Sequence, residues 1–321
     1  MNDSANGLPQ DDPENHRCPK GSYPAMVTPF REDGTIDFDG VDRLTDWHVE
    51  AGVAGIFACG LSAEINWMQD AEKIALADRI VQRVAGRIPV VATAIRQGTI
   101  DDQAQLVCRM HDIGAEVVAI SVCQLAEESE EDRVWIKRFN ALVQQVPASI
   151  PLAFYECPLP YWRLLSDQTI DHVAQTGRFC FLKDTCCDID TIRRRLDIIR
   201  DTRLQLFNAN TPTLLASLGA GADGFCGIGA NYFPELYAWI CRHFADQSEL
   251  ASNLHQFLDS TFRLTEGEFY PVSAKWYVRE RGVEIGLASR KLPDATLPAK
   301  LIEDLNTIRT SEIEWMERVR G

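Results

Sequence analysis

One pattern restricts what this sequence can fold into: a short, β-rich apolar run followed by a segment with helical periodicity, repeated eight times. Most of these runs are continuously apolar instead of alternating, which is typical of parallel strands buried on both faces. The runs are Ser22–Thr28, Gly55–Cys59, Pro89–Ala94, Val117–Val122, Pro151–Tyr155, Phe179–Lys183, Leu204–Asn208 and Gly224–Ile228. Such a series over about 220 residues favours a closed (β/α)8 barrel, the TIM-barrel class of α/β fold, over an open doubly wound sheet.

The segments between the runs have the spacing of amphipathic helices. In Ala71–Val84, the residues Ile74, Ala77 and Val81 fall on one face, and charged residues lie elsewhere. The same periodicity covers Asp101–Ile113, Arg133–Val146, Asp167–Thr176, Asp190–Arg200 and Thr211–Leu218. No G-x-G-x-x-G motif opens a helix after the first run, which argues against a dinucleotide-binding fold.

The chain is expected to have three parts. Residues 1–20 are polar and contain three prolines and no apolar signal-peptide core, so we expect a mobile tail. Residues 21–245 form the predicted barrel. Residues 246–321 carry helical segments without strands and are expected to form a C-terminal helical domain, packed against the barrel or against a neighbouring subunit.

Composition narrows the classes of partner. The chain has 321 residues and a formal net charge of −15, which argues against binding to a phosphate backbone. The basic run Arg193–Arg195 lies near Asp190 and Asp197 in a helical segment, and we interpret it as a solvated helix face. The longest apolar runs fall far short of the ~20 residues of a membrane helix. We expect neither a nucleic-acid partner nor a membrane span.

Cysteine and histidine positions bear on redox state and metals. Most of the ten cysteines lie within or beside apolar runs, and no C-x-x-C pair occurs, which is typical of free thiols in a reducing compartment, the cytosol. His48, His111 and His172 lie in helical segments without metal-ligand spacing. We therefore expect no metal and no organic cofactor.

Two residues at the ends of neighbouring runs are candidates for chemistry, because barrel enzymes place their working residues at the C-terminal ends of strands. Lys183 ends an apolar run, so its amine is expected to point into a poorly hydrated cavity. Desolvation favours the neutral amine, which attacks carbonyl carbons to form Schiff bases. The structural alternative is an ion pair with Asp184 or with another carboxylate at the barrel rim. Tyr155 ends the preceding run and is a candidate general acid/base beside that amine; the alternative is an aromatic that only packs its ring.

Several motifs occur in order along the chain. They are Ala25–Phe30, G-x-x-x-E at Gly60–Glu64, Y-x-x-P at Tyr155–Pro158, L-K-D at Leu182–Asp184, Gly221–Gly224 with Asn231 and Pro234, and, in the tail, Gly282, Arg290 and Pro293. Each motif alone is weak. As an ordered set from about Gly21 to Pro234 they resemble the dihydrodipicolinate synthase/N-acetylneuraminate lyase family.

The resemblance implies class I aldolase chemistry on a barrel with a C-terminal helical domain, assembled as a homotetramer. It implies that Lys183 condenses with the ketone of pyruvate or another 2-oxo acid and that Tyr155 moves protons. It also implies that Ser62 and the backbone amide of Ala63 hold the substrate carboxylate, and that Glu64 is a structural contact.

This sequence departs from the family at several positions. The family loop is usually G-[ST]-[TS]-G-E, whereas Leu61 replaces the first hydroxyl, which normally belongs to a proton relay with the tyrosine, and Ala63 replaces the second glycine. Cys123 and Gln124 stand where dihydrodipicolinate synthases carry a tyrosine pair. Pro160 stands where they carry an arginine for the second substrate. These departures argue against the lysine-pathway synthase activity.

The residues after the last two runs bear on the substrate tail. Sialic acid lyases place hydroxyl and acidic groups there, whereas Ile228–Ala230 are apolar in this chain. Asn208, Asn210 and Thr211 are expected to hydrogen-bond a shorter polyol chain. Tyr161 and Trp162 are candidates to pack under a bulkier substrate tail, although packing at the barrel rim is the favoured interpretation. Sialic acid is therefore disfavoured as the substrate.

The sequence thus predicts a cytosolic Schiff-base lyase, an aldolase or dehydratase, acting on a 2-oxo acid such as a 2-keto-3-deoxy sugar acid or a 4-hydroxy-2-oxo acid. Two alternatives stay open: a catalytically weak 2-oxo-acid-binding barrel, since Leu61 leaves the relay incomplete, and dihydrodipicolinate synthase itself. Aldol cleavage and dehydration share the same iminium, so the sequence does not decide between them.

Overall fold

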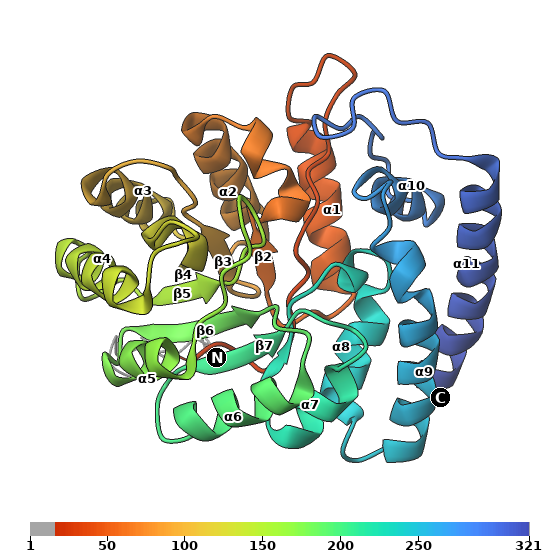
Figure 1. The fold of residues 1–321 in the computed structure, drawn as a ribbon. Coiled ribbons are helices and arrows are strands. Elements are labelled where there is room, and N and C mark those ends of the chain that lie inside the picture. Colours follow the sequence, from red (N-terminus) through yellow and green to blue (C-terminus); the bar gives the residue numbers. More distant parts are fainter. Residues whose placement is uncertain (1–16, 321) are drawn as a thin grey trace, which may run out of the picture.

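The computed structural model describes residues 17–320 of the chain and has eight parallel strands in one curled sheet (Figure 1). The hydrogen-bonded order is β1-β8-β7-β6-β5-β4-β3-β2, so every strand except β1 lies next to its neighbour in sequence. The strands are β1 (Gly21–Ser22), β2 (Ile56–Ala58), β3 (Val90–Thr93), β4 (Val117–Ser121), β5 (Leu152–Tyr155), β6 (Phe179–Asp184), β7 (Gln205–Asn208) and β8 (Gly224–Phe225). The predicted α/β barrel is confirmed.

The segment after β1 closes the sheet. The backbone N–H of Met26 donates to the carbonyl of Phe57 at 3.1 Å, and Phe57 N–H donates to the carbonyl of Pro24 at 3.0 Å. β1 itself is shorter than the predicted run, although Tyr23 and Ala25 still donate their backbone N–H groups to the carbonyls of Phe225 and Gly227, at 2.8 and 3.5 Å. Residues 23–26 therefore bond alternately to the β8 side and to the β2 side.

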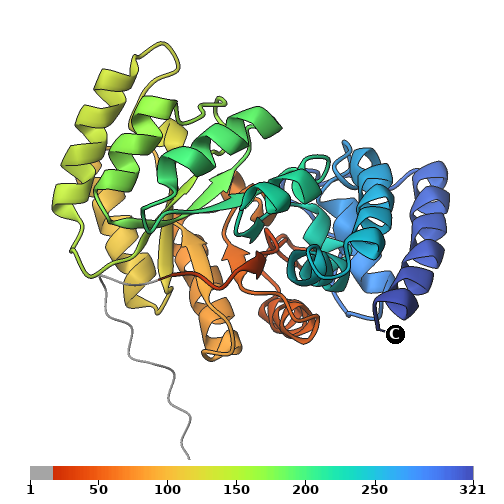
Figure 2. The same ribbon diagram turned by 90° about the horizontal axis from the view of Figure 1, so that it is seen from below.

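Helices cover the outside of the sheet, one after each strand (Figures 1 and 2). They are α1 (Phe38–Glu50), α2 (Asp70–Val84), α3 (Ile100–Asp112), α4 (Asp132–Gln145), α5 (Asp167–Gln175), α6 (Ile189–Ile199), α7 (Leu214–Ala220) and α8 (Pro234–His243). α7 starts three residues later than Thr211, the predicted start, because residues 210–213 form a turn in which Thr213 N–H donates to Asn210 Oδ1 at 3.2 Å.

Three further helices, α9 (Ser248–Thr265), α10 (Val272–Glu280) and α11 (Ala299–Arg320), stack on one side of the barrel next to α8 (Figure 1). α9 packs against α7 and α8, and α11 packs against α8 and α9. We propose that the boundary between barrel and helical region follows α8, at residue 245, because α8 contacts β1 and β8. No helix between residues 17 and 320 is long and apolar enough to cross a membrane.

The start of the described chain is fixed to the barrel. Cys18 is buried, and its backbone N–H and carbonyl exchange hydrogen bonds of 2.7 and 3.0 Å with the side chain of Gln205 in β7. The chain therefore packs against the barrel two residues before the predicted end of the mobile tail at residue 20. The rest of that predicted tail, residues 1–16, lies outside the described residues.

Aromatic side chains fill the barrel interior. Phe181 stacks on Phe207 at 3.9 Å between ring centroids, and Tyr23 meets both rings edge-on. Phe57 meets the ring of Tyr155 edge-on at 5.4 Å. This filling leaves room for a ligand only above these rings, at the C-terminal ends of the strands.

Candidate active site

A cavity of about 360 Å³ opens at the C-terminal ends of the strands. Its wall combines β5 and β6 with the loops after β2, β7 and β8 and with part of the C-terminal helical region. The lining residues include Leu61, Ser62, Tyr155, Trp162, Lys183, Asn210, Ile228, Phe262, Glu266, Tyr270 and Lys291. The cavity thus contains both residues that the sequence singles out for chemistry.

Lys183 lies deep in this cavity. Its side chain is 5% exposed, and its Nζ lies 4.6 Å from the ring centroid of Phe57 and 4.6 Å from that of Tyr155. Tyr155 and Lys183 are register partners on adjacent strands, which places the phenol and the amine side by side. No ion pair joins Lys183 to a carboxylate in the described part of the chain.

A buried network explains why Lys183 has no carboxylate partner. Arg195 of α6 donates to both carboxylate oxygens of Glu156, at 2.7 and 3.0 Å, and to Asp184. It also donates to the carbonyl of Leu165 at 2.7 Å. Asp184 is therefore bound to Arg195 and not to Lys183, which removes the structural alternative for the lysine.

Arg195 corrects one interpretation of the sequence. The run Arg193–Arg195 was expected to be a solvated helix face, but the side chain of Arg195 is 1% exposed. Arg193 and Arg194 are more than half exposed, as expected. The helical period turns every third or fourth residue inward, so a charged residue with buried carboxylates opposite it enters the interior.

Tyr155 is almost completely buried, at 4% exposure. Burial is the main reason why the pKa of its phenol is raised well above the ordinary value of 10, and the nearby Cys157 thiol raises it further. The hydroxyl therefore stays protonated at neutral pH. In this state the phenol carries its proton inside the cavity.

The loop after β2 brings only part of its predicted residues to the cavity. Ser62 lines the wall, in the short 3-10 turn Leu61–Ala63. Ala63 is buried away from it, and its backbone N–H donates to the carbonyl of Gly60 at 3.0 Å. The turn itself uses this donor, and the role of the Ala63 amide toward a carboxylate stays a prediction.

The polar trio after β7 is also divided. Asn210 lines the cavity. Asn208 is fully buried and donates to the hydroxyls of Thr213 and Ser217 at 2.9 and 3.0 Å. Thr211 is buried and pairs with the hydroxyl of Tyr237 at 2.7 Å. Asn208 therefore stabilises the start of α7, and Thr211 binds Tyr237 of α8. Contrary to the expectation from the sequence, neither of these two residues lines the cavity.

The C-terminal region supplies wall residues that sequence reasoning missed: Phe262, Glu266, Tyr270 and Lys291. The hydroxyl of Tyr270 accepts from Asn231 Nδ2 at 3.2 Å. Lys291 Nζ donates to the carbonyl of Tyr270 at 3.0 Å. No periodicity or motif in the tail indicates that the chain between α9 and α10 covers the barrel mouth.

Glu64 fixes this region over the barrel, in the structural role expected for it. Its carboxylate pairs with the buried ammonium of Lys275 at 2.6 Å and accepts from the hydroxyl of Ser289 at 2.8 Å. It also accepts the backbone N–H groups of Arg290 and Lys291, at 2.7 and 2.9 Å. The loop that carries Ser62 is thereby tied to the segment that carries Lys291.

Glu266 is the one carboxyl residue among the described residues of the cavity wall. Burial raises the pKa of this carboxyl to about 7, and the charge of Lys183 opposes the rise. The group is therefore close to half ionised at neutral pH. The pKa of a surface glutamate lies near 4.3.

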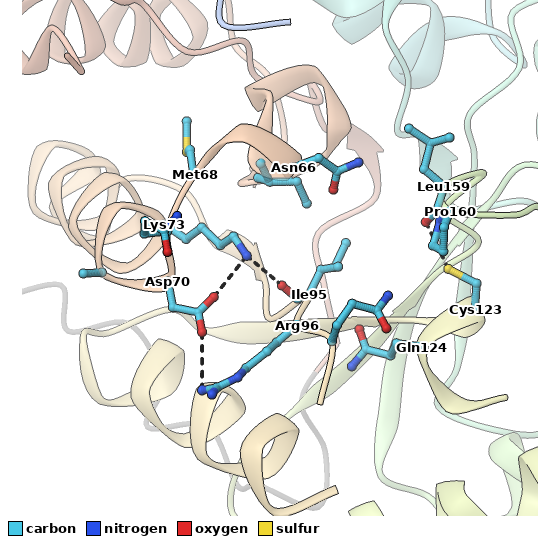
Figure 3. Close-up of a pocket in the computed structure, with 14 residues that line it drawn as sticks. Asn66, Met68, Asp70, Lys73, Ile95, Arg96, Cys123, Gln124, Leu159 and Pro160 are labelled. Carbon is cyan, nitrogen blue, oxygen red and sulfur yellow. Dashed lines mark hydrogen bonds and ion pairs between the residues drawn. The ribbon is translucent and has the colours of Figure 1, made fainter. Parts of the chain in front are cut away.

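A larger cavity of about 690 Å³ lies beside the barrel mouth, between the loops after β2, β3, β4 and β5 (Figure 3). Asp70 pairs there with both Lys73 and Arg96, at 3.1 and 3.3 Å, so these charges are satisfied within the protein. Cys123 donates to the carbonyl of Leu159 at 3.1 Å on the opposite side. Neither Lys183 nor Tyr155 reaches this cavity, and we therefore assign the chemistry to the smaller one.

Within residues 17–320, no group of three or more His, Cys, Asp or Glu residues is arranged to hold a metal ion. The expectation that the chemistry uses neither a metal nor an organic cofactor stays a prediction.

A barrel with a buried lysine and a tyrosine at the ends of adjacent strands defines a lyase of the class I aldolase type. The sequence profile of the Dihydrodipicolinate synthetase family matches residues 18–304, and the chain belongs to this family. The predicted family and enzyme class are thereby confirmed, and a binding barrel without catalysis is not favoured.

Curated relatives agree with this assignment. The chain is 28% identical over 281 residues to the 4-hydroxy-tetrahydrodipicolinate synthase of Laribacter hongkongensis, covering 86% of this chain and 94% of that protein. It is 29% identical over 271 residues to the synthase of an Azoarcus species, with 83% and 90% covered.

Solved structures share the fold. A dihydrodipicolinate synthase from Acinetobacter baumannii complexed with pyruvate superimposes with a TM-score of 0.81 at 23% identity, over 91% of this chain and 98% of that one. A prophage protein of the same family from E. coli K12, also in complex with pyruvate, gives a TM-score of 0.81 at 20% identity, over 91% and 98%.

The Arg195 network leads to a stability prediction. Arg195→Met leaves the buried carboxylates of Glu156 and Asp184 without a counter-charge, so the free energy of unfolding should fall by about 3–5 kcal/mol in urea denaturation. Arg194→Met, one residue earlier and exposed, should change it by less than about 0.5 kcal/mol. Equal effects of the two substitutions would contradict the structural role of Arg195.

The raised pKa of Glu266 leads to a pH prediction. A carboxyl that is harder to ionise in the folded state adds stability below its unfolded pKa, and this stability is lost as the pH rises through about 7. Between pH 5 and pH 8, the wild-type free energy of unfolding should therefore fall relative to Glu266→Gln by roughly 2–3 kcal/mol. Parallel pH profiles for the two proteins would show that the carboxyl is not buried as described.

Proposed function

We propose that this enzyme is a Schiff-base-forming lyase that cleaves or dehydrates a 2-oxo acid such as a 2-keto-3-deoxy sugar acid or a 4-hydroxy-2-oxo acid. The observation that carries the proposal is the amine of Lys183, which lies in an apolar cavity, beside the phenol of Tyr155 and without a carboxylate partner. An amine in such surroundings is suited to attack a carbonyl carbon.

In the proposed reaction, Lys183 Nζ adds to the C2 ketone of the substrate, and the resulting carbinolamine loses water to give an iminium. The iminium withdraws electrons from C3. Either the C3–C4 bond then breaks and its electron pair moves to the nitrogen as an enamine, or a C3 proton leaves and hydroxide departs from C4. In the cleavage, the enamine then takes up a proton at C3 and becomes an imine again. Hydrolysis of the imine releases the product and restores the amine.

Tyr155 and Ser62 have supporting roles in this proposal. The phenol of Tyr155, kept protonated by burial, donates a proton to the oxygen that leaves as water. The hydroxyl of Ser62, which lines the same cavity, is a donor for the substrate carboxylate. Asn210 lines the same cavity and is available to a hydroxyl on the substrate tail.

The substrate class rests on positions where the chain differs from the synthases it resembles. Cys123 and Gln124 stand in place of a tyrosine pair; Cys123 donates to the carbonyl of Leu159, and Gln124 donates to the side chain of Gln103. Pro160 stands in place of the arginine and has no side-chain donor. These residues line the larger cavity, outside the one with Lys183. We therefore propose a substrate other than that of the relatives, which are named 4-hydroxy-tetrahydrodipicolinate synthases. The cytosolic location and the homotetramer stay predictions.

Borohydride trapping tests the proposal. Incubation with pyruvate and sodium borohydride should leave a reduced adduct on Lys183, identified by peptide mass spectrometry, because borohydride reduces the iminium to a stable amine. Lys183→Arg should leave no adduct. Lys291→Arg is the matched control for the second amine of the cavity and should still form the adduct on Lys183.

The same trap should be repeated with longer 2-oxo acids, since a dehydratase need not hold free pyruvate well. Failure to form an adduct with any of them would contradict the Schiff-base mechanism. An adduct on Lys291 instead of Lys183 would contradict the assignment of the nucleophile.

A further inference from the structure

Glu266 occupies a position that the fold does not explain. It ends α9 and lies at the negative end of the helix dipole, where an anion is disfavoured. No hydrogen bond or ion pair to its carboxylate occurs in the described part of the chain. A partly buried carboxyl without a partner costs stability, so its placement in the cavity wall points to a role toward a ligand.

The charged and titratable groups around Glu266 define what it faces. Lys183 is the cation that acts on it, and Lys291 lines the same cavity. Its own charge acts on Cys187 and on the phenols of Tyr232, Tyr237 and Tyr270. Glu266 is therefore the one carboxyl, among the described residues, that shares this cavity with Lys183.

We propose that Glu266 is a further catalytic residue, which accepts the proton of the substrate's C4 hydroxyl during carbon–carbon cleavage and returns it in the reverse reaction. This role selects 2-oxo acids with a hydroxyl group at C4. The inference rests on the function proposed above and adds to it the group that handles the tail.

The proton balance of the step is complete. As the C3–C4 bond of the iminium breaks, its electron pair forms the enamine, the C4–O–H bond gives its proton to the Glu266 carboxylate, and an aldehyde leaves. In condensation, protonated Glu266 gives this proton to the aldehyde oxygen while the enamine carbon attacks the carbonyl carbon. No oxidant, reductant or metal takes part.

Glu266 suits this task better than Tyr155. A general base must lose its own proton near working pH, and the pKa of the Tyr155 phenol is raised well above 10 by burial. Leu61, which lines the cavity, supplies no hydroxyl through which Tyr155 could pass a proton. The carboxyl of Glu266 has a pKa of about 7, where both of its protonation states are populated.

The test separates chemistry at C3 from chemistry at the C4 oxygen. Exchange of the pyruvate methyl protons in D2O, followed by NMR, requires the iminium of Lys183 but no aldehyde. Condensation of pyruvate with D-glyceraldehyde, glycolaldehyde or glyoxylate requires proton transfer to the aldehyde oxygen as well. Both rates are measured for the wild type, Glu266→Gln, Glu266→Asp and the control Glu268→Gln, an exposed carboxylate two residues further along.

In Glu266→Gln we expect exchange within about twofold of the wild type and condensation slower by roughly 10²- to 10⁴-fold. Glu266→Asp should recover part of the condensation, and Glu268→Gln should match the wild type. Wild-type condensation should also slow as the pH rises through about 7, because protonated Glu266 is the donor, and the Gln variant should lack this dependence.

Condensation by Glu266→Gln at the wild-type rate would overturn the inference and leave the proposed function intact. Loss of exchange and condensation together in this variant would also overturn it, since Glu266 would then act on Lys183. A wild type that exchanges pyruvate but condenses it with none of the aldehydes would likewise overturn it. A wild type that shows neither exchange nor a borohydride adduct would instead reject the Schiff-base function itself.

Discussion

The guanidinium of Arg195 is shared by two buried carboxylates, and the geometry of the site depends on this sharing. Glu156 follows Tyr155, and Asp184 follows Lys183, so one cation joins the ends of the two strands that carry the phenol and the amine. Both carboxylates are fully buried, and each forms an ion pair with Arg195. Hydrophobic residues of similar volume often stabilise a protein as well as such an ion network does. We therefore infer that the network of Arg195 contributes by fixing the positions of the two strand ends. It keeps carboxylates away from Lys183 and leaves that amine to a substrate.

A second buried ion pair completes the site from the other side. Glu64, at the end of the loop that carries Ser62, binds Lys275 of α10 and the backbone at Arg290 and Lys291. The C-terminal helices are thereby fixed over one side of the barrel mouth, where Glu266 and Tyr270 join the cavity wall. Two buried carboxylate networks thus hold the two sides of the cavity. One lies within the barrel, and the other joins the barrel to the C-terminal helical region.

The sequence predicts the barrel well because each strand is a continuous apolar run, and burial on both faces admits little else. Lys183 and Tyr155 are predictable for the same reason, since a polar residue that ends such a run is set at the barrel mouth. The environments of Ala63, Asn208 and Thr211 are harder to predict, because other groups of the protein compete for their polar atoms. Ala63 N–H is used by its own turn, Asn208 by the start of α7, and Thr211 by Tyr237 of α8. The positions of Glu266 and Tyr270 in the cavity wall result from packing of the C-terminal region against the barrel. The spacing of residues in the sequence does not indicate this long-range contact.

The most direct test of this account is a crystal structure of the protein treated with pyruvate and sodium borohydride. We expect continuous electron density from Lys183 Nζ to C2 of the former pyruvate, its carboxylate on the hydroxyl of Ser62, and its C3 carbon directed toward Glu266. Asp184 should remain on Arg195. An unmodified Lys183 turned toward Asp184, or an adduct outside this cavity, would contradict it.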